Sequence, residues 1–389
     1  MPLTVLNVAY PMTEVGPDAV GGSEQILTIL DRALTEAGHQ SLVLAAAGSN
    51  VTGTLIPSEP MPKRMDEEVR IRASVIHGEL IRQILAECAV DVIHMHSLDF
   101  HRYLPPPPVP VLATLHLPPN WYPREIFNAT RPGFNLNCVS HSQLAACPIS
   151  PIMLPPISNG IDMGDMPLAP ERLGYAACLG RVCPEKGYHF ALDAARKAAM
   201  PLKLAGAVFP YQSHFDYFDK EIAPRLDAER QFVGPVAYSD KTKFLSQAAC
   251  LVVSSSVAET SSLAAMEALA CGTPVIAFNV GALPELIESG RTGFIVSNVE
   301  EMAEALTKVH LLRAEDCRKA ARTRCSSGVM AKSYLDLYRC MSQHPVVFSN
   351  PRRLVPQLNS AKVSKLRRAG ASAASGSTGS PINGVTCVA

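Results

Sequence analysis

Two glutamates eight residues apart, Glu259 and Glu267, have the types and spacing to bind opposite ends of one ligand. The apolar residues 250–253 predict a strand, and Ser261 or Ser262 can cap the helix that follows. Glu267 then lies about two turns into that helix, roughly 10 Å from Glu259 along its axis. The helix N-terminus between them attracts anions, and carboxylates accept hydrogen bonds from hydroxyl groups. The pattern predicts a site for a diphosphate with a sugar at each end.

A pair of glutamates at this spacing is more often simply two solvated helix residues. Here the apolar segments 250–253 and 274–278 flank the predicted helix on both sides. Strands in those positions place the helix N-terminus at the carboxyl edge of a parallel sheet, where ligands of open α/β sheets bind. This context favours the ligand-binding interpretation.

Two cations, Arg181 and Lys186, follow directly on another predicted strand, residues 175–179, and flank a proline. A tight loop there lies at the carboxyl edge of the sheet and faces the same region as Glu259. Two positive charges in such a loop can neutralise a diphosphate leaving group. By itself the spacing is uninformative, because surface lysines and arginines are common.

A glycine-bearing loop, Gly16 to Ser23, follows the first predicted strand and nearly matches the nucleotide-binding pattern G-x-x-x-x-G-K-[ST]. The lysine of that pattern is missing, so the sequence argues against an ATPase. The backbone amides of Gly21 and Gly22 remain candidates for a phosphate contact, and a plain strand-to-helix turn is the alternative. No G-x-G-x-x-G follows the strand, which disfavours a nicotinamide-dependent dehydrogenase.

Five histidines cluster in the first part of the chain and raise the hypothesis of a metal site. They show neither H-x3-H nor H-E-x-x-H spacing, and no nearby cysteine pair completes a ligand set. We therefore expect no metal centre there. These residues are His94, His96, His101, His116 and His141.

The elements that position these residues alternate between strands and helices, which predicts α/β domains with parallel, doubly wound sheets. The first set comprises strands at 3–10, 41–46, 91–94, 109–115 and 136–139 and helices at 23–37 and 67–88. The second comprises strands at 175–179, 202–205, 231–233, 250–253 and 274–278 and helices at 187–199, 217–226, 240–248, 299–312, 314–325 and 329–341, besides the helix that carries Glu267.

The proline-rich residues 148–156 interrupt this alternation and mark a domain boundary. We expect one domain over residues 1–156, a second over 157–328, a helix over 329–344 that crosses back to the first, and a low-complexity, disordered tail over 345–389.

The bulk properties exclude several classes of protein. The 389 residues suffice for about two domains, and 35 basic against 35 acidic residues create no global field that would recruit nucleic acid. No apolar run approaches the length of a membrane span and no signal peptide is evident. The 11 cysteines include no C-x-x-C and fit buried thiols in a reducing cytoplasm. The tail carries six basic residues, which we interpret as solvated rather than as peripherally bound to the inner face of a membrane.

Several ordered motifs together resemble the retaining GT-B glycosyltransferases of family 4. Glu259 and Glu267, followed by ALACGTPV, are similar to the E-x7-E signature of that family, and the resemblance extends to about Met341. The other motifs are GGSE from Gly21, NGID from Asn159 and LGRVCPEKG from Leu179. The resemblance implies an α/β fold of two Rossmann-like, doubly wound domains facing a central cleft, with the C-terminal helix returning to the first domain. It makes the first domain the acceptor side and the second the donor side.

The resemblance also implies transfer of a hexose from a nucleoside diphosphate sugar, with UDP as the expected nucleotide, to an acceptor hydroxyl with retention of configuration. The acceptor is a saccharide, a lipid-linked saccharide or a small molecule, and no metal cofactor is expected. Catalytic roles fall on Glu259, Arg181, Lys186 and His116, and donor-binding roles on Gly21, Gly22, Val233, Ser262, Leu263 and Glu267.

One segment departs from the family pattern. Many relatives carry Pro-Phe-Gly after the first glutamate, whereas this chain has Thr260-Ser261-Ser262. Serine replaces the glycine whose backbone approaches the phosphates, so the identity of the donor sugar is not carried over. Two alternatives stay open, a GT-B epimerase that acts on the nucleotide sugar and a nucleotide-sugar-binding protein without transfer activity.

Overall fold

The computed structural model describes the chain except for residues 20, 63–65, 165, 167–171, 210 and 344–389. The predicted tail, residues 345–389, lies outside the described residues. Two compact units account for the rest of the chain. Unit 1 comprises Met1–Val139, Ala146–Ile157 and the described residues from Ala331 onward, and unit 2 comprises Ser140–Ala145 and Ser158–Met330.

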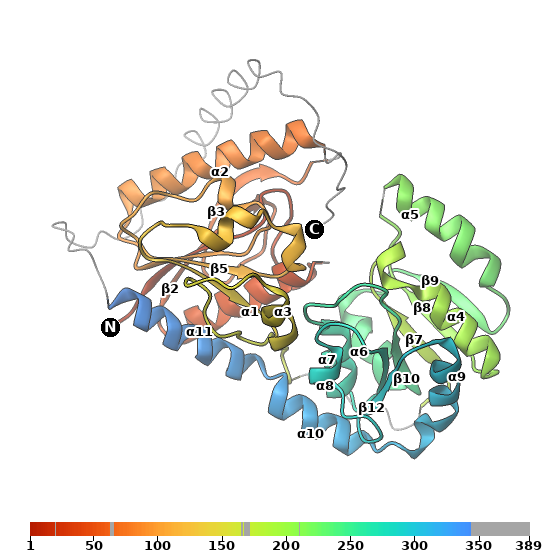
Figure 1. The fold of residues 1–389 in the computed structure, drawn as a ribbon. Helices are drawn as coiled ribbons and strands as arrows, with labels where there is room; N and C mark the ends of the chain where they lie inside the picture. Colours follow the sequence, from red (N-terminus) through yellow and green to blue (C-terminus); the bar gives the residue numbers. More distant parts are fainter. Residues whose placement is uncertain (20, 63–65, 165, 167–171, 210, 344–389) are drawn as a thin grey trace. The chain divides into compact units, whose positions relative to one another are not determined.

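Unit 1 contains a six-stranded sheet in the order β3-β2-β1-β4-β5-β6, and all of its strand pairs are parallel (Figure 1). The central strands are buried almost throughout, as expected where both faces of a parallel sheet are covered. The strands are β1 Thr4–Val8, β2 Gln40–Ala47, β3 Thr54–Pro60, β4 Val92–Met95, β5 Val111–Leu115 and β6 Phe134–Cys138. The helices that accompany them are α1 Gly22–Glu36, α2 Glu67–Glu87 and α11 Ser327–Ser342, the last helix among the described residues.

Strand β3 is absent from the sequence-based prediction. Its sequence, TLIPSEP, contains Pro57 and Pro60, and prolines argue against a strand because they cannot donate ladder hydrogen bonds. The structure resolves the conflict by placing β3 at the edge of the sheet, next to β2 alone. An edge strand tolerates proline where its N–H positions face away from the sheet.

Helix α11 packs its aromatic face against the sheet of unit 1. Tyr334 and Tyr338 are fully buried. The Tyr338 hydroxyl lies 2.6 Å from Nδ1 of His94 on β4, and the Tyr334 hydroxyl lies 3.2 Å from Oγ1 of Thr114 on β5. Burial raises the pKa of both phenols, so both remain neutral partners. The C-terminal helix is thus part of the core of the first unit.

Unit 2 repeats the same topology with the order β12-β11-β10-β7-β8-β9, again with parallel pairs throughout. Numbered within each unit, both sheets have the Rossmann order 3-2-1-4-5-6. The strands are β7 Ala176–Leu179, β8 Leu202–Ala205, β9 Arg230–Gly234, β10 Cys250–Val253, β11 Val275–Phe278 and β12 Gly293–Val296. The predicted doubly wound α/β fold is confirmed in both units.

The helices of unit 2 follow the prediction with two corrections. The helix expected at 217–226 instead begins as α5 at Gln212 and continues through a π turn and a 3-10 turn, because Pro224 interrupts regular helix geometry. The short strand β12 and the helix α8 Leu283–Leu286 were not predicted. The other helices are α4 Tyr188–Lys197, α6 Tyr238–Gln247, α7 Leu263–Ala270, α9 Val299–Lys308 and α10 Ala314–Arg324; a short α3, His141–Ala146, precedes them.

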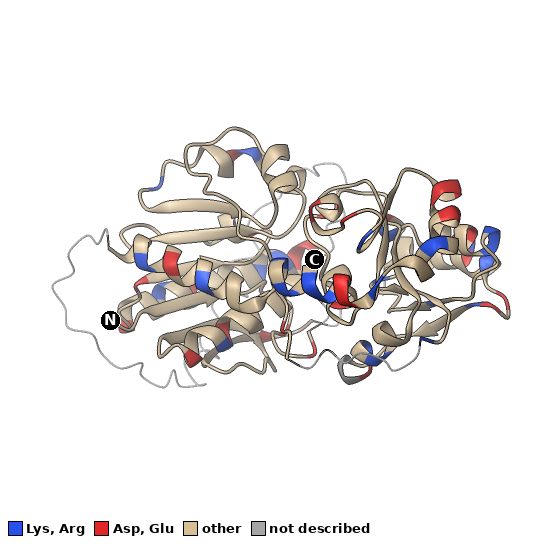
Figure 2. Ribbon diagram, turned by 90° about the horizontal axis from the view of Figure 1, so that it is seen from below, with Lys and Arg blue, Asp and Glu red and all other residues tan. Residues whose placement is uncertain are grey.

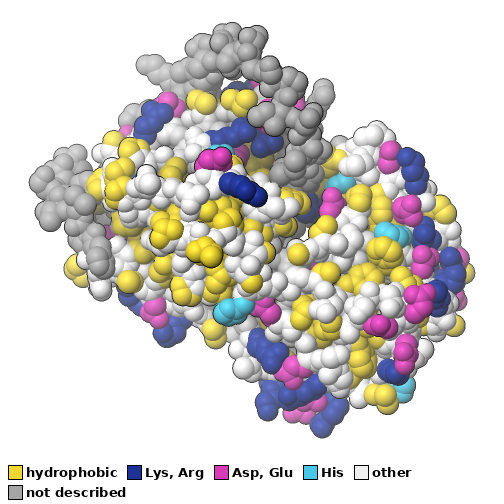
Figure 3. Space-filling model, in the orientation of Figure 1, with side chains coloured by type: hydrophobic (Ala, Val, Ile, Leu, Met, Phe, Trp, Pro, Cys, Tyr) yellow, Lys and Arg dark blue, Asp and Glu magenta, His cyan; other side chains and the backbone are white. Residues whose placement is uncertain are grey.

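Charged side chains of both signs are interspersed along the helices of each unit (Figure 2). On the face that Figure 3 shows, they alternate with apolar side chains instead of forming one broad basic area. Within the described part of the chain, no helix combines the length and the apolar character needed to cross a bilayer. The thiols of Cys88, Cys178, Cys250 and Cys271 are buried, as expected from the sequence, whereas Cys147 is half-buried and Cys340 is exposed.

Candidate functional site

The predicted helix that carries Glu267 is present as α7. Strand β10 ends at Val253, a polar loop follows, and Ser262 caps the helix with its side chain accepting from the Ala265 N–H. Ser262 has extended backbone dihedral angles, as an N-cap residue requires. Glu259 lies in the loop before the cap and Glu267 lies on the second turn. The local geometry inferred from the sequence is therefore confirmed.

Glu259 and Lys186 form an ion pair, with 2.6 Å between Oε1 and Nζ. The side chains are 11% and 28% exposed, respectively. The hydroxyl of Ser255 donates to the same Oε1 atom, so Glu259 is held from two sides. The contact joins the loop after β7 to the loop after β10, the two strands at which the strand order of unit 2 reverses. Ligands of doubly wound sheets bind at such a switch point.

Gly187 explains how the loop that bears Lys186 approaches β10 so closely. Its φ of +59° is in the left-handed region, and a Cβ atom at this position would lie 2.3 Å from the carbonyl oxygen of Ser254. Two hydrogen bonds hold the loop there, from the Ser254 hydroxyl to the Lys186 carbonyl and from the Ser256 N–H to the Glu185 carbonyl. Only glycine combines this backbone angle with this contact.

Replacement of Gly187 by alanine is expected to lower the free energy of unfolding by at least about 2 kcal/mol, since left-handed strain adds to a clash with backbone. Gly174 provides the matched control, because its φ is +75° but a Cβ atom there meets nothing within 4 Å. Gly174→Ala is expected to cost only about 1 kcal/mol. Urea unfolding of both variants measures the difference, and equal losses would argue against the close packing of the loop.

Arg181, the other predicted cation, lies at the start of the same loop. Its guanidinium carbon is 5.8 Å from the centroid of the Phe209 ring, within range of a cation–π interaction. The ring thus contributes to the position of this side chain beside the switch point. The structure brings Lys186 and Glu259 into direct contact, and it places the Arg181 guanidinium beside the Phe209 ring.

Glu267 is buried and pairs with Lys241 of α6, at 2.6 Å between Oε1 and Nζ. The two side chains are 8% and 12% exposed. Burial raises the pKa of the Glu267 carboxyl, and the Lys241 ammonium partly offsets this effect. Lys241 was not singled out from the sequence, because nothing local signals that α6 and α7 bring together residues 26 positions apart.

Val233, predicted beside the base of the nucleotide, lies on β9 with 42% of its surface exposed. An exposed valine close to the carboxyl end of a strand can offer an apolar surface to a planar ligand. Leu263, the first residue of α7, contributes a backbone amide at the helix start.

In unit 1, the glycine loop ends at Gly21, which is the N-cap of α1, and Gly22 is the first helical residue. The carboxylate of Glu24 folds back over this helix start, so that a Cβ atom on Gly21 would lie 1.9 Å from Glu24 Oε2. Glu24 is buried and accepts from Thr13 and Ser23 hydroxyls at 2.8 and 2.9 Å. A phosphate at this helix start would therefore compete with an anion of the protein itself.

His116 follows β5 in unit 1, where it is half-buried beside the buried His96. Its Nε2 atom lies 3.1 Å from Nδ1 of His96, and its N–H donates to the Tyr122 hydroxyl. Burial lowers the pKa of His116 to about 4, so the imidazole is neutral at physiological pH. The Tyr122 ring is buried, and its hydroxyl also accepts from the backbone N–H of Leu117, so it supports the backbone after β5.

The two Rossmann-like sheets define a GT-B fold, the class expected from the sequence. Residues 167–324, most of unit 2, match the family model described as glycosyl transferases group 1. That match covers the loop with Arg181 and Lys186, the glutamate pair and the whole of α7. The donor-side motifs thus lie inside the matched segment.

Curated relatives match over a short segment. D-inositol 3-phosphate glycosyltransferase from Mycobacterium tuberculosis is 42% identical over 90 residues, which is 23% of this chain and 18% of the relative. The same identity is found with the Mycobacterium bovis protein. The aligned segment therefore spans less than a fifth of these relatives.

Solved structures match over nearly the whole chain. AviGT4, a glycosyltransferase involved in avilamycin A biosynthesis, is 24% identical with a TM-score of 0.68, covering 88% of this chain and 99% of that one. Sucrose-phosphate synthase from Thermosynechococcus elongatus is 18% identical with a TM-score of 0.70, covering 87% and 99%. HepE from Anabaena, solved in complex with UDP and glucose, is 16% identical with a TM-score of 0.66, covering 87% and 99%. These likenesses establish the fold.

Proposed function

We propose that this protein is a glycosyltransferase that moves a hexose from a nucleoside diphosphate sugar to an acceptor hydroxyl with retention of configuration. The observation that carries the proposal is the Lys186–Glu259 contact, which joins the GRVCPEKG loop to the E-x7-E segment. The group 1 match over the same residues supports it. The HepE structures with UDP and with UDP-glucose support a UDP-sugar as the donor.

The donor-binding roles follow from charge and hydrogen-bonding capacity. Arg181 and Lys186 would neutralise the diphosphate, and the backbone amides at Ser262 and Leu263 would bind its oxygens. Glu267 would accept hydrogen bonds from the ribose hydroxyls. In this interpretation Gly21 and Gly22 offer further amides to the phosphates, and Val233 packs beside the base.

The paired state of Lys186 suggests how the donor engages the site. The Lys186 ammonium is paired with the Glu259 carboxylate. A bound diphosphate would supply a second anion for the ammonium and leave Glu259 able to accept hydrogen bonds from hydroxyls of the transferred sugar. We propose that His116, a neutral imidazole, contacts that sugar through a hydrogen bond.

In the transfer step, the bond between the anomeric carbon and the diphosphate oxygen breaks and a bond to the acceptor oxygen forms. The acceptor proton passes to an oxygen of the departing diphosphate, whose developing charge Arg181 and Lys186 stabilise. We expect no metal ion in this step, because two cationic side chains serve the leaving group.

The proposal is tested by incubating the full chain with UDP-sugars and a panel of saccharide, lipid-linked and small-molecule hydroxyl acceptors. We expect release of UDP only when an acceptor is present, and a product with the anomeric configuration of the donor in its NMR spectrum. Conversion of the nucleotide sugar without acceptor would show an epimerase instead. Binding without any turnover would show a nucleotide-sugar-binding protein.

A further inference from the structure

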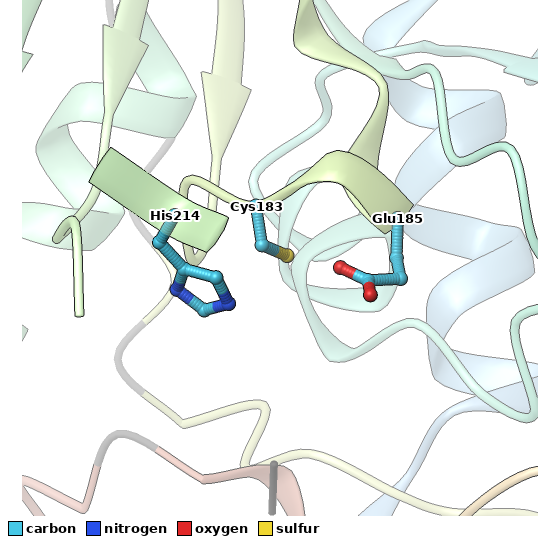
Figure 4. Close-up of side chains that lie close together, drawn as sticks. All are labelled: Cys183, Glu185 and His214. Atoms are coloured by element: carbon cyan, nitrogen blue, oxygen red, sulfur yellow. The ribbon is translucent and has the colours of Figure 1, made fainter. Parts of the chain in front are cut away.

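Three side chains with different ligand atoms converge beside the loop that bears Arg181 and Lys186. Cys183 and Glu185 belong to this loop, and His214 lies on α5, 29 residues beyond Glu185 in the chain (Figure 4). Their sulfur, carboxylate oxygen and imidazole nitrogen all lie within 4.8 Å of one another. Among the residues that the structure describes, this is the one such group of three or more metal-binding side chains.

The ligand atoms make few contacts of their own. The Cys183 thiol contacts the Arg181 carbonyl oxygen at 3.7 Å, a weak interaction for sulfur. Nδ1 of His214 is buried without a hydrogen-bond partner among the described residues. A buried imidazole nitrogen without a partner is costly, and such a group points to a missing ligand or a functional role.

The backbone holds two of the three ligands in place. The carbonyl of Cys183 accepts from the Lys186 N–H at 3.1 Å, and the His214 N–H donates to the Tyr211 carbonyl at 3.0 Å. Both side chains are buried, whereas the Glu185 side chain reaches solvent and can adjust. Ligands at ordinary zinc bond lengths lie roughly 3.4–3.6 Å apart, so no pair of ligand atoms must approach by more than about 1.4 Å. The flexible Glu185 side chain can provide much of this movement.

The chemistry of the three ligands selects a cation of intermediate softness. A thiolate and an imidazole favour zinc, whereas magnesium and calcium prefer oxygen ligands alone. The positive charge of Arg181 acts on both Cys183 and His214 and repels cations such as magnesium, which bind mainly by electrostatic attraction. The zinc–thiolate bond is strong enough to offset this repulsion. The thiolate and the carboxylate together neutralise the two charges of Zn²⁺.

We propose that Cys183, Glu185 and His214 form a zinc-binding site with water as the fourth ligand. Binding replaces the thiol proton, which passes to solvent, by a sulfur–zinc bond. The ion would tie the loop of Arg181 and Lys186 to α5 and takes no part in the sugar transfer. The site does not depend on the proposed transferase function, because its ligands are defined by their own geometry.

The test is a titration of the full chain, freed of metal by a chelator, with Zn²⁺ by calorimetry and with Co²⁺ by absorption. No nucleotide sugar is present, so the outcome is independent of the transferase assignment. We expect one strong zinc site per chain and a thiolate-to-cobalt charge-transfer band. Cys183→Ser is expected to abolish the band. His214→Gln is expected to weaken zinc binding by at least about 10²-fold, more than the loss of a residue that only hydrogen-bonds to a metal ligand usually does.

Matched controls are Cys340→Ser and His310→Gln, which replace exposed residues away from the group. Both should bind zinc like the wild-type protein. Glu185→Gln changes a solvent-accessible side chain, so it is expected to fold normally and to bind zinc more weakly. It therefore tests the site even if a variant of the buried Cys183 or His214 fails to fold. A missing charge-transfer band, or equal zinc affinity in the wild type and Glu185→Gln, would overturn the proposal.

Discussion

Replacement of Lys186 by alanine is expected to lower the turnover number for UDP release by a factor of about 10² to 10³, the usual cost of removing one donor that stabilises developing charge. The ammonium is 2.6 Å from Glu259 and lies at the switch point of unit 2, where we place the diphosphate. Its loss removes positive charge where the leaving group becomes more negative. The effect should therefore fall mainly on kcat rather than on KM.

A control for this variant is Lys197→Ala in the same unit. Lys197 pairs with Glu300 at 2.5 Å, but both side chains are exposed, and such surface pairs contribute little. For Lys197→Ala we expect turnover within about twofold of the wild type and a free energy of unfolding within about 1 kcal/mol of the wild-type value. If the folded Lys186→Ala variant kept the wild-type turnover number, Lys186 would have no catalytic role.

Replacement of Lys241 by methionine is expected to lower the free energy of unfolding by about 3–5 kcal/mol at neutral pH, as when one member of a buried ion pair is removed. Methionine fills most of the volume of the lysine side chain. The loss of stability therefore measures the cost of leaving the Glu267 carboxylate buried without its partner. The expected readout is urea unfolding monitored by circular dichroism.

The loss of unfolding free energy in Lys241→Met should depend on pH. Burial already raises the pKa of Glu267, and removal of the Lys241 ammonium raises it further. A pKa that is higher in the folded state favours folding at low pH, and this advantage is lost as pH rises through the folded-state value. The Lys241→Met deficit should therefore be smaller near pH 5 than near pH 8, with the unfolded glutamate titrating at about 4.3.

Lys308→Met serves as the matched control for the stability measurement. Lys308 also forms a 2.6 Å pair, with Glu304, but on an exposed helix surface. Its loss should cost under about 1 kcal/mol at either pH. A deficit for Lys241→Met that is equally small, or one that grows toward acid pH, would contradict the account of Glu267 as a buried carboxylate.

The segments that could be predicted from the sequence are those with strong local signals. The Ser262 cap and the apolar strands β10 and β11 specify α7 within a short stretch, so the placement of Glu259 and Glu267 follows from residues that are neighbours in the chain. The parallel, doubly wound character of both sheets also follows from the alternation of strands and helices, whereas the strand order does not, since β3 and β12 were not predicted.

The remaining features depend on contacts between distant residues. Lys241 becomes a partner of Glu267 only when α6 packs beside α7, and His214 reaches Cys183 only when α5 returns to the loop after β7. Strand β3 was not predicted because prolines are unfavourable in strands. The chain forms a strand there nevertheless, because β3 lies at the edge of the sheet, where prolines are tolerated. Similarly, the position of Glu24 over the start of α1 shows only in three dimensions.

The central claim, that unit 2 binds a nucleoside diphosphate sugar, is tested most directly by thermal unfolding of the full chain with UDP, GDP and ADP sugars. A ligand at about 100 times its Kd adds about 2.7 kcal/mol of stability. We expect a UDP-sugar to raise the Tm by several degrees in the wild type and by much less in Glu267→Gln, which loses the carboxylate assigned to the ribose. An unchanged Tm of the wild-type protein with every nucleotide sugar would contradict the claim.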